Sequence, residues 1–96
     1  MKKREILEKV YTLNEERLQY QPRDKKAWYS RGFLLIELRR LAESLFCYDI
    51  LIELNPNDDK AWAIKGYVLS RLGKDEEAIR CYDRAIMLLM MSRRRK

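Results

Sequence analysis

The hydrophobic positions of residues 58–91 follow the spacing of two successive amphipathic α-helices. The first series recurs at three- and four-residue steps, through Trp62, Gly66, Leu69 and Leu72. The second series has the same spacing, through Ala78, Tyr82, Ala85 and Leu89. Gly73 lies between the two series and favours a break, while Asp58 or Asp59 and then Asp75 are suitable N-cap residues. This segment predicts two antiparallel helices joined by a tight turn.

The same pattern occurs once more, in the segment that directly precedes this one. When residues 24–57 are aligned with residues 58–91, 13 of the 34 positions are identical. The identical residues of the earlier copy are Asp24, Lys26, Ala27, Trp28, Gly32, Leu35, Leu38, Glu43, Cys47, Tyr48, Asp49, Ile52 and Leu54. Pro56 separates the copies, because proline lacks the amide hydrogen that a continuing helix needs. A fixed period of this length indicates two copies of one structural unit.

Residues 1–22 match the second half of the unit only weakly, through Leu7 and Pro22. Their apolar positions nevertheless form one stripe, made up of Ile6, Leu7, Val10, Tyr11 and Leu18. Polar residues such as Asn14, Glu16 and Arg17 predict a capping helix whose outer side is polar, which keeps the end of a repeat array soluble. We therefore expect one domain with about five helices: a capping helix in 1–22, repeats in 23–57 and 58–91, and a basic tail in 92–96.

This repeated helix pair resembles the tetratricopeptide repeat. The second copy carries the residues of that motif at Trp62, Gly66, Leu69, Gly73, Ala78, Tyr82 and Ala85. The first copy carries Trp28, Gly32, Leu35, Tyr48 and Pro56, but has Arg39, Ser44 and Leu51 where the motif favours Gly, Ala and Ala. The resemblance implies an all-α superhelix, a right-handed solenoid of antiparallel helix pairs. It also implies a protein–protein interaction module without catalytic activity.

The connection between the two helices of the first copy has two interpretations. Residues 38–42 contain no glycine, proline or strong capping residue, and each is a good helix former. Residues 24–54 could therefore run as one long helix and exchange halves with a second chain. The match to the repeat motif favours a turn instead.

In the tetratricopeptide repeat family, the first helix of each pair lines a concave groove that receives a peptide or helix of a partner. Position by position, the resemblance places Lys26, Tyr29, Phe33, Ile36 and Glu37 of the first pair in this groove. From the second pair it places Lys60, Ala63, Tyr67, Ser70 and Arg71 there. Tyr29 and Phe33 stand where members that clamp acidic chaperone tails carry Lys and Asn, so an apolar or amphipathic segment is the expected ligand. Alternatively, these aromatic side chains only pack on the N-terminal helix or on a dimer mate.

The end of the second copy differs from the end of the first. Residues 86–91 read Ile-Met-Leu-Leu-Met-Met and are apolar on every side of a helix, whereas residues 52–57 finish with Asn-Pro-Asn. An uncovered apolar surface of this kind is typical of an interaction site. We hypothesise a homodimer whose interface includes Ile86, Leu89, Met90 and Met91.

The net charge of +6 suggests nucleic acid or an anionic surface as a second kind of partner. Four of the basic residues are Arg93, Arg94, Arg95 and Lys96, so the remaining chain has a net charge of only +2. This tail could bind RNA or an anionic surface by releasing counterions. A solvated helix end is the simpler interpretation, because no basic stripe with stacking aromatic residues continues the contact.

Residue types that serve catalysis and metal binding are scarce. Histidine is absent, so the commonest general base and metal ligand is missing. Cys47 and Cys81 are a full repeat length apart, which is not the spacing of a zinc-ligand pair or of a CxxC redox motif. We expect buried, reduced thiols in a cytoplasmic protein, with no cofactor, no metal and no catalytic residue. The longest apolar run is too short to span a bilayer.

Overall fold

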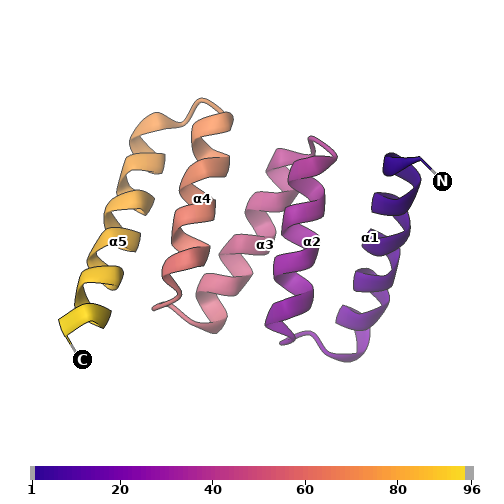
Figure 1. The fold of residues 1–96 in the computed structure, drawn as a ribbon, viewed down its shortest axis with the longest axis horizontal. Helices are drawn as coiled ribbons and strands as arrows, with labels where there is room; N and C mark the ends of the chain where they lie inside the picture. The colour runs from indigo at the N-terminus through magenta and orange to yellow at the C-terminus, as the bar shows by residue number, and fades with distance from the viewer. Residues whose placement is uncertain (1, 95–96) are drawn as a thin grey trace.

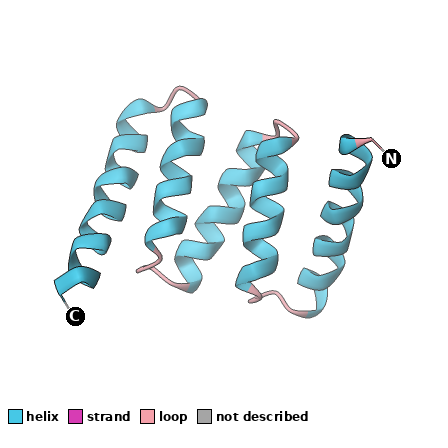
Figure 2. Ribbon diagram, viewed as in Figure 1, coloured by secondary structure: helices cyan, strands magenta, loops and turns pink. Residues whose placement is uncertain are grey.

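Five helices make up the part of the chain that the computed structural model describes, residues 2–94. They are α1 (Lys3–Tyr20), α2 (Lys25–Glu37), α3 (Leu41–Leu54), α4 (Asp59–Arg71) and α5 (Asp75–Arg94). They lie side by side in chain order, with the two ends of the chain at opposite ends of the row (Figure 1). Short loops join them, and each helix packs on the next one along the chain (Figure 2). The predicted all-α fold of five helices in a superhelical array is confirmed.

Aspartate side chains fix the start of the first helix in each repeat. The Asp24 carboxylate accepts a hydrogen bond from the Ala27 amide at 3.3 Å, and Asp58 accepts one from the Ala61 amide at 3.2 Å. Both are N-caps that satisfy an amide with no partner inside the helix. The prediction that Asp75 caps the last helix is wrong, because α5 begins at Asp75 itself.

The turn inside each repeat uses a residue in the left-handed backbone region. Arg39 has φ of 62° in the first repeat, and Gly73 has φ of 81° in the second. Immediately after each of these residues, an amide donates back to a carbonyl five residues earlier, from Arg40 to Leu35 at 2.8 Å and from Lys74 to Leu69 at 2.9 Å. The chain therefore turns at residues 38–40, and the alternative of one continuous helix over 24–54 is wrong for the single chain.

A tyrosine of the second helix packs directly on a glycine of the first helix in each repeat. A Cβ atom at Gly32 would lie 2.8 Å from Cε2 of Tyr48, and one at Gly66 would lie 2.9 Å from Cδ1 of Tyr82. Glycine is thus required for this close approach. Tyr48, with Leu51 and Ala61, forms a buried cluster between the two repeats.

The tryptophans and cysteines occupy equivalent places in the two repeats. Trp28 Nε1 donates to the Pro22 carbonyl at 2.7 Å, and Trp62 Nε1 donates to the Pro56 carbonyl at 2.9 Å. These bonds tie each first helix to the loop that precedes it. Cys47 and Cys81 are buried free thiols, as predicted.

The two ends of the row depart from expectation. Leu13 and Tyr20 of α1 are 63% and 84% exposed, so the prediction that the outer side of this helix is polar is wrong at these positions. At the other end, α5 continues through Ser92 to Arg94, so the first part of the predicted tail is helical. Arg95 and Lys96, the rest of that tail, lie outside the described residues.

In the described part of the chain, no helix has the length and apolar character to cross a membrane.

Candidate functional site

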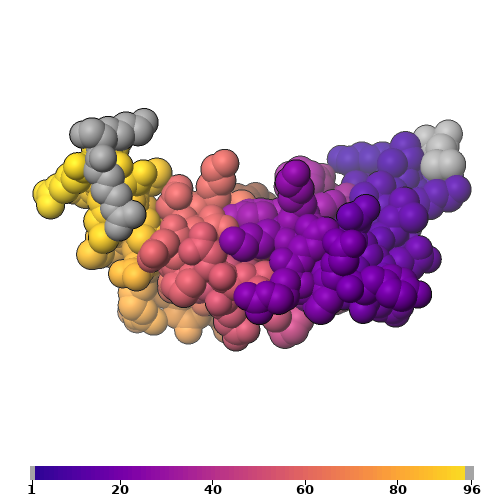
Figure 3. All heavy atoms as spheres, turned by 90° about the horizontal axis from the view of Figure 1, so that it is seen from below, coloured from indigo at the N-terminus to yellow at the C-terminus, as the bar shows by residue number. Residues whose placement is uncertain are grey.

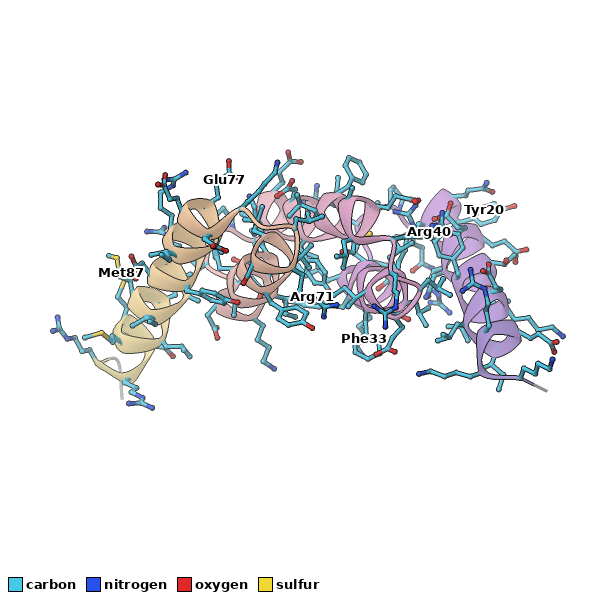
Figure 4. The ribbon with its side chains drawn as sticks, turned by 90° about the horizontal axis from the view of Figure 1, so that it is seen from above. Tyr20, Phe33, Arg40, Arg71, Glu77 and Met87 are labelled. Atoms are coloured by element: carbon cyan, nitrogen blue, oxygen red, sulfur yellow. The ribbon has the colours of Figure 1, made fainter. Side chains whose placement is uncertain are left out.

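The first helices of the two repeats, α2 and α4, carry the ten residues that the resemblance assigns to the groove, at three- and four-residue spacing along each helix. We call this the α2–α4 surface and define it by Lys26, Tyr29, Phe33, Ile36, Glu37, Lys60, Ala63, Tyr67, Ser70 and Arg71. Phe33 and Arg71 lie on the same edge, whereas Glu77 lies on the opposite one (Figure 4). The space-filling view shows an elongated molecule with α1 at one end, α5 at the other, and the two repeats between them (Figure 3).

Two aromatic side chains of the α2–α4 surface are open to solvent. Phe33 is 58% exposed and Tyr67 is 42% exposed, and each lies at the same position of its repeat. Arg71 donates to the Tyr67 hydroxyl at 2.8 Å, and its guanidinium carbon lies 5.8 Å from the centre of the ring. Lys26 of α2 and Lys60 of α4 are exposed as well. The surface therefore combines apolar rings with positive charge.

Tyr29 and Ile36 lie deeper than the other members of this surface. Both pack against the buried cluster around Tyr48. The Tyr29 hydroxyl donates to Oδ2 of Asp58 at 2.5 Å, which joins α2 to the N-terminus of α4. Burial and the neighbouring Asp58 carboxylate both raise the pKa of Tyr29. The structure thus places these two side chains partly in the core between the repeats, with Phe33 and Tyr67 on the outside.

The remaining residues assigned to this surface are small or already engaged. Ala63 is half-buried, and it occupies in the second repeat the position that Tyr29 occupies in the first. Glu37 pairs with Lys3 of α1 at 3.4 Å, so its charge is partly neutralised. Ser70 is exposed. The α2–α4 surface therefore has a positive balance, from Lys26, Lys60 and Arg71.

The C-terminal half of α5 exposes the apolar residues that the sequence assigned to self-association. Ile86, Leu89, Met90 and Met91 are each about half exposed, at 54, 49, 52 and 49%. Leu88 is buried against the rest of the molecule, so the helix is not exposed on every side. Ile79 and Met87, which the predicted interface does not name, are exposed to a similar degree. The repeat held a signal for Ile79, because its equivalent residue is Leu45, which packs against the next helix pair.

Solved structures resemble this fold closely but differ in sequence. The chain superposes on MamA MSR-1 C2 with a TM-score of 0.80 and 22% identity, over 93% of this chain and 52% of that chain. It superposes on MamA AMB-1 P212121 with a TM-score of 0.82 and 21% identity, over 88% of this chain and 46% of that chain. The chain thus spans about half the length of these MamA chains. A comparison with curated proteins found no significant match.

Family models match both repeats. One tetratricopeptide repeat model covers residues 25–58, which correspond to α2, α3 and the loop that follows. A second tetratricopeptide repeat model covers residues 47–80, from the middle of α3 to the beginning of α5. The two matches overlap and together cover most of the segment that contains both glycine–tyrosine contacts and both N-caps. The chain belongs to the tetratricopeptide repeat family.

Proposed function

We propose that this protein is a non-catalytic protein–protein interaction module that binds a peptide or helix of a partner on the α2–α4 surface. The observation that carries the proposal is the exposure of Phe33 and Tyr67 at equivalent positions of two adjacent repeats. Exposed aromatic rings on rigid helices supply large contact areas with few rotatable bonds. Membership of the tetratricopeptide repeat family supports a role in protein binding.

The chemistry of the surface selects the kind of segment that binds. Phe33 and Tyr67 offer apolar contact, and the Tyr67 ring is already held by Arg71 before a partner arrives. Lys26, Lys60 and Arg71 favour acidic residues at the ends of the bound segment, since opposite charges at the rim of an interface steer association and fix register. We therefore propose an apolar or amphipathic segment with acidic flanks as the ligand.

Selection from a random-peptide display library tests this proposal. Selected peptides should contain an apolar core with Asp or Glu beside it, and calorimetry should show that they bind the chain. The double variant Phe33→Ala, Tyr67→Ala should weaken that binding at least tenfold, about 1.4 kcal/mol, while the circular dichroism spectrum stays unchanged. Phe46→Ala is the matched control, because Phe46 of α3 is 57% exposed and lies outside the α2–α4 surface. Peptides that bind the double variant as tightly as the wild type would refute the proposal.

We further propose that the protein forms a homodimer through the exposed apolar residues of α5, Ile86, Leu89, Met90 and Met91. Half-exposed Leu and Met side chains in one segment favour burial against a second copy. Sedimentation velocity at tens of micromolar should show a dimer, and Leu89→Glu should convert it to a monomer. Leu13→Glu is the control, since Leu13 is exposed on α1 at the other end of the row. A monomeric wild type would contradict this proposal.

We also propose a cytoplasmic location for the protein. Cys47 and Cys81 are free thiols buried in different repeats, and a reducing compartment keeps such thiols free. Fractionation of source cells with an antibody to the chain tests this location, and recovery in an oxidising compartment would contradict it.

A further inference from the structure

An equivalent ion pair occurs at both places where the second helix of one unit meets the first helix of the next. Where α1 meets α2, Glu15 pairs with Arg31. Where α3 meets α4, Asp49 pairs with Lys65, Oδ1 to Nζ, at 2.8 Å. The two acids are one repeat length apart in sequence and so are the two bases, so the same contact recurs with the period of the repeat. In both cases the acid comes from the second helix of one unit and the base from the first helix of the next.

Apolar contacts surround the ion pair between α3 and α4. Ile52 of α3 packs on the cluster that contains Ala61 of α4, and Leu45 of α3 packs on the cluster that contains Leu69. Because Ala61, Lys65 and Leu69 follow one another at four-residue steps, they share one face of α4. Ala61 of this face forms one buried cluster with Tyr48 of α3, which is only 1% exposed.

The same side chains recur on α5, but there they are open. A shift by one repeat length carries Leu45, Tyr48, Asp49 and Ile52 onto Ile79, Tyr82, Asp83 and Ile86. Ile79 and Ile86 are 58% and 54% exposed, and Tyr82 is 36% exposed. Among the described residues, Asp83 forms no ion pair. We call this set of four residues the α5 face.

We propose that the α5 face binds an α-helix of another polypeptide that carries a small residue, a Lys or Arg four positions later and a Leu four positions after that. The helix would lie antiparallel to α5, as α4 lies on α3, with its small residue over Ile86, its base at Asp83 and its leucine over Ile79. This proposal rests on the proposed protein-binding function and identifies a second surface for it.

A folded second copy does not supply such a helix. Within the described chain, α2 and α4 carry the required pattern, as Ala27, Arg31 and Leu35 and as Ala61, Lys65 and Leu69. Their bases are engaged by Glu15 and Asp49, and their alanines and leucines are buried. The occupant that we propose is therefore a helix of a different polypeptide and not a folded second copy. The homodimer proposed above shares Ile86 with this face, but its proposed interface does not include Asp83, so the charge at residue 83 separates the two proposals.

A synthetic peptide with the sequence of residues 57–74 is a defined probe for this face, because it contains α4 complete with its cap. Fluorescence anisotropy of the labelled peptide, titrated with the full chain, should show saturable binding. Asp83→Lys should weaken binding at least tenfold, because it replaces attraction with repulsion. Glu77→Lys is the matched control: it makes the same charge change on the same helix but outside the α5 face, where Glu77 lines a hollow with Trp62 and Arg84.

Exchange of the two charges gives the decisive comparison. A peptide with Lys65→Glu should bind the wild-type chain weakly and should regain affinity for the Asp83→Lys chain. Absence of saturable binding to the wild type, or equal binding to wild type and Asp83→Lys, would overturn the proposal. Loss of peptide binding in the Phe33→Ala, Tyr67→Ala variant would also overturn it, because the peptide would then occupy the α2–α4 surface. If the display selection yields no peptide for the α2–α4 surface, the peptide titration still tests the α5 face. The two proposals can therefore be refuted independently.

Discussion

Tyr48 packs so closely on Gly32 that a single methyl group at residue 32 would meet its ring at 2.8 Å. Tyr48 is 1% exposed and cannot move away without disturbing the core between the repeats. We expect Gly32→Ala to lower the free energy of unfolding by about 1–2 kcal/mol, because overpacking outweighs the better helix propensity of alanine.

The second repeat supplies the matched comparison for this prediction. Gly66 makes the same contact with Tyr82, but Tyr82 is 36% exposed, and the nearest backbone atom, the Ala78 carbonyl oxygen, would lie 3.2 Å from the added Cβ. Gly66→Ala should therefore destabilise the protein less than Gly32→Ala. Urea denaturation followed by circular dichroism measures both, and an equal loss in the two variants would contradict the role given to Tyr48.

Substitutions at the two turn residues should change the stability of the protein in opposite directions. Arg39 has φ of 62° and carries a side chain where the second repeat has Gly73 with φ of 81°. Arg39→Gly should stabilise the protein by roughly 0.5 kcal/mol, because relief of the left-handed conformation exceeds the added entropy of the unfolded chain. Gly73→Ala should destabilise it by about 1 kcal/mol. Thermal unfolding tests both, and a destabilising Arg39→Gly would show that the arginine side chain itself holds the turn.

Asp58 should be more important for stability than Asp24. Both cap a helix, but the second partner of Asp24 is Arg17 in an exposed contact at 3.5 Å, whereas Asp58 accepts a part-buried hydrogen bond from Tyr29 at 2.5 Å. Asp58→Ala should lower the free energy of unfolding by about 2–3 kcal/mol, against about 1 kcal/mol for Asp24→Ala. A double-mutant cycle between Tyr29→Phe and Asp58→Ala should give a coupling free energy of about 1 kcal/mol. Additive effects in that cycle would mean that the hydrogen bond contributes nothing.

Alkaline pH should destabilise the fold through its buried phenols. Burial raises the pKa of Tyr48 to about 12 from an ordinary value of 10.0, and burial and Asp58 raise the pKa of Tyr29. Since the folded state holds these protons more tightly than the unfolded state, their contribution is complete below pH 10 and declines as the pH rises from 10 to about 12. Urea midpoints should fall over this range, and Tyr48→Phe should reduce the slope. An unchanged slope in Tyr48→Phe would contradict this account.

Periodicity accounts for most of what the sequence could predict. The repeat period indicated the helices and the caps at the starts of the repeats, because each depends on residues within one unit. The same period also holds the signal for the ion pairs, since Glu15 and Arg31 recur as Asp49 and Lys65. That signal becomes apparent only when pairs from adjacent helices are compared.

Features that depend on three-dimensional detail could not be predicted from the sequence. The Tyr29 hydroxyl lies on Asp58 of the next repeat, and no local pattern specifies that contact. The exposure of Leu13 and Tyr20 follows from which face of α1 meets α2. The start of α5 at Asp75 was missed because several acidic residues follow one another there, and helix propensity alone does not choose the cap among them.

We propose that α2 and α4 together form the binding surface for a partner segment. Amide chemical-shift mapping can locate this surface on the isotope-labelled chain, titrated with a peptide from the display selection. We expect the largest shifts in α2 and α4, around Phe33 and Tyr67, with smaller changes elsewhere. Shifts confined to α1 or to α5 would contradict it.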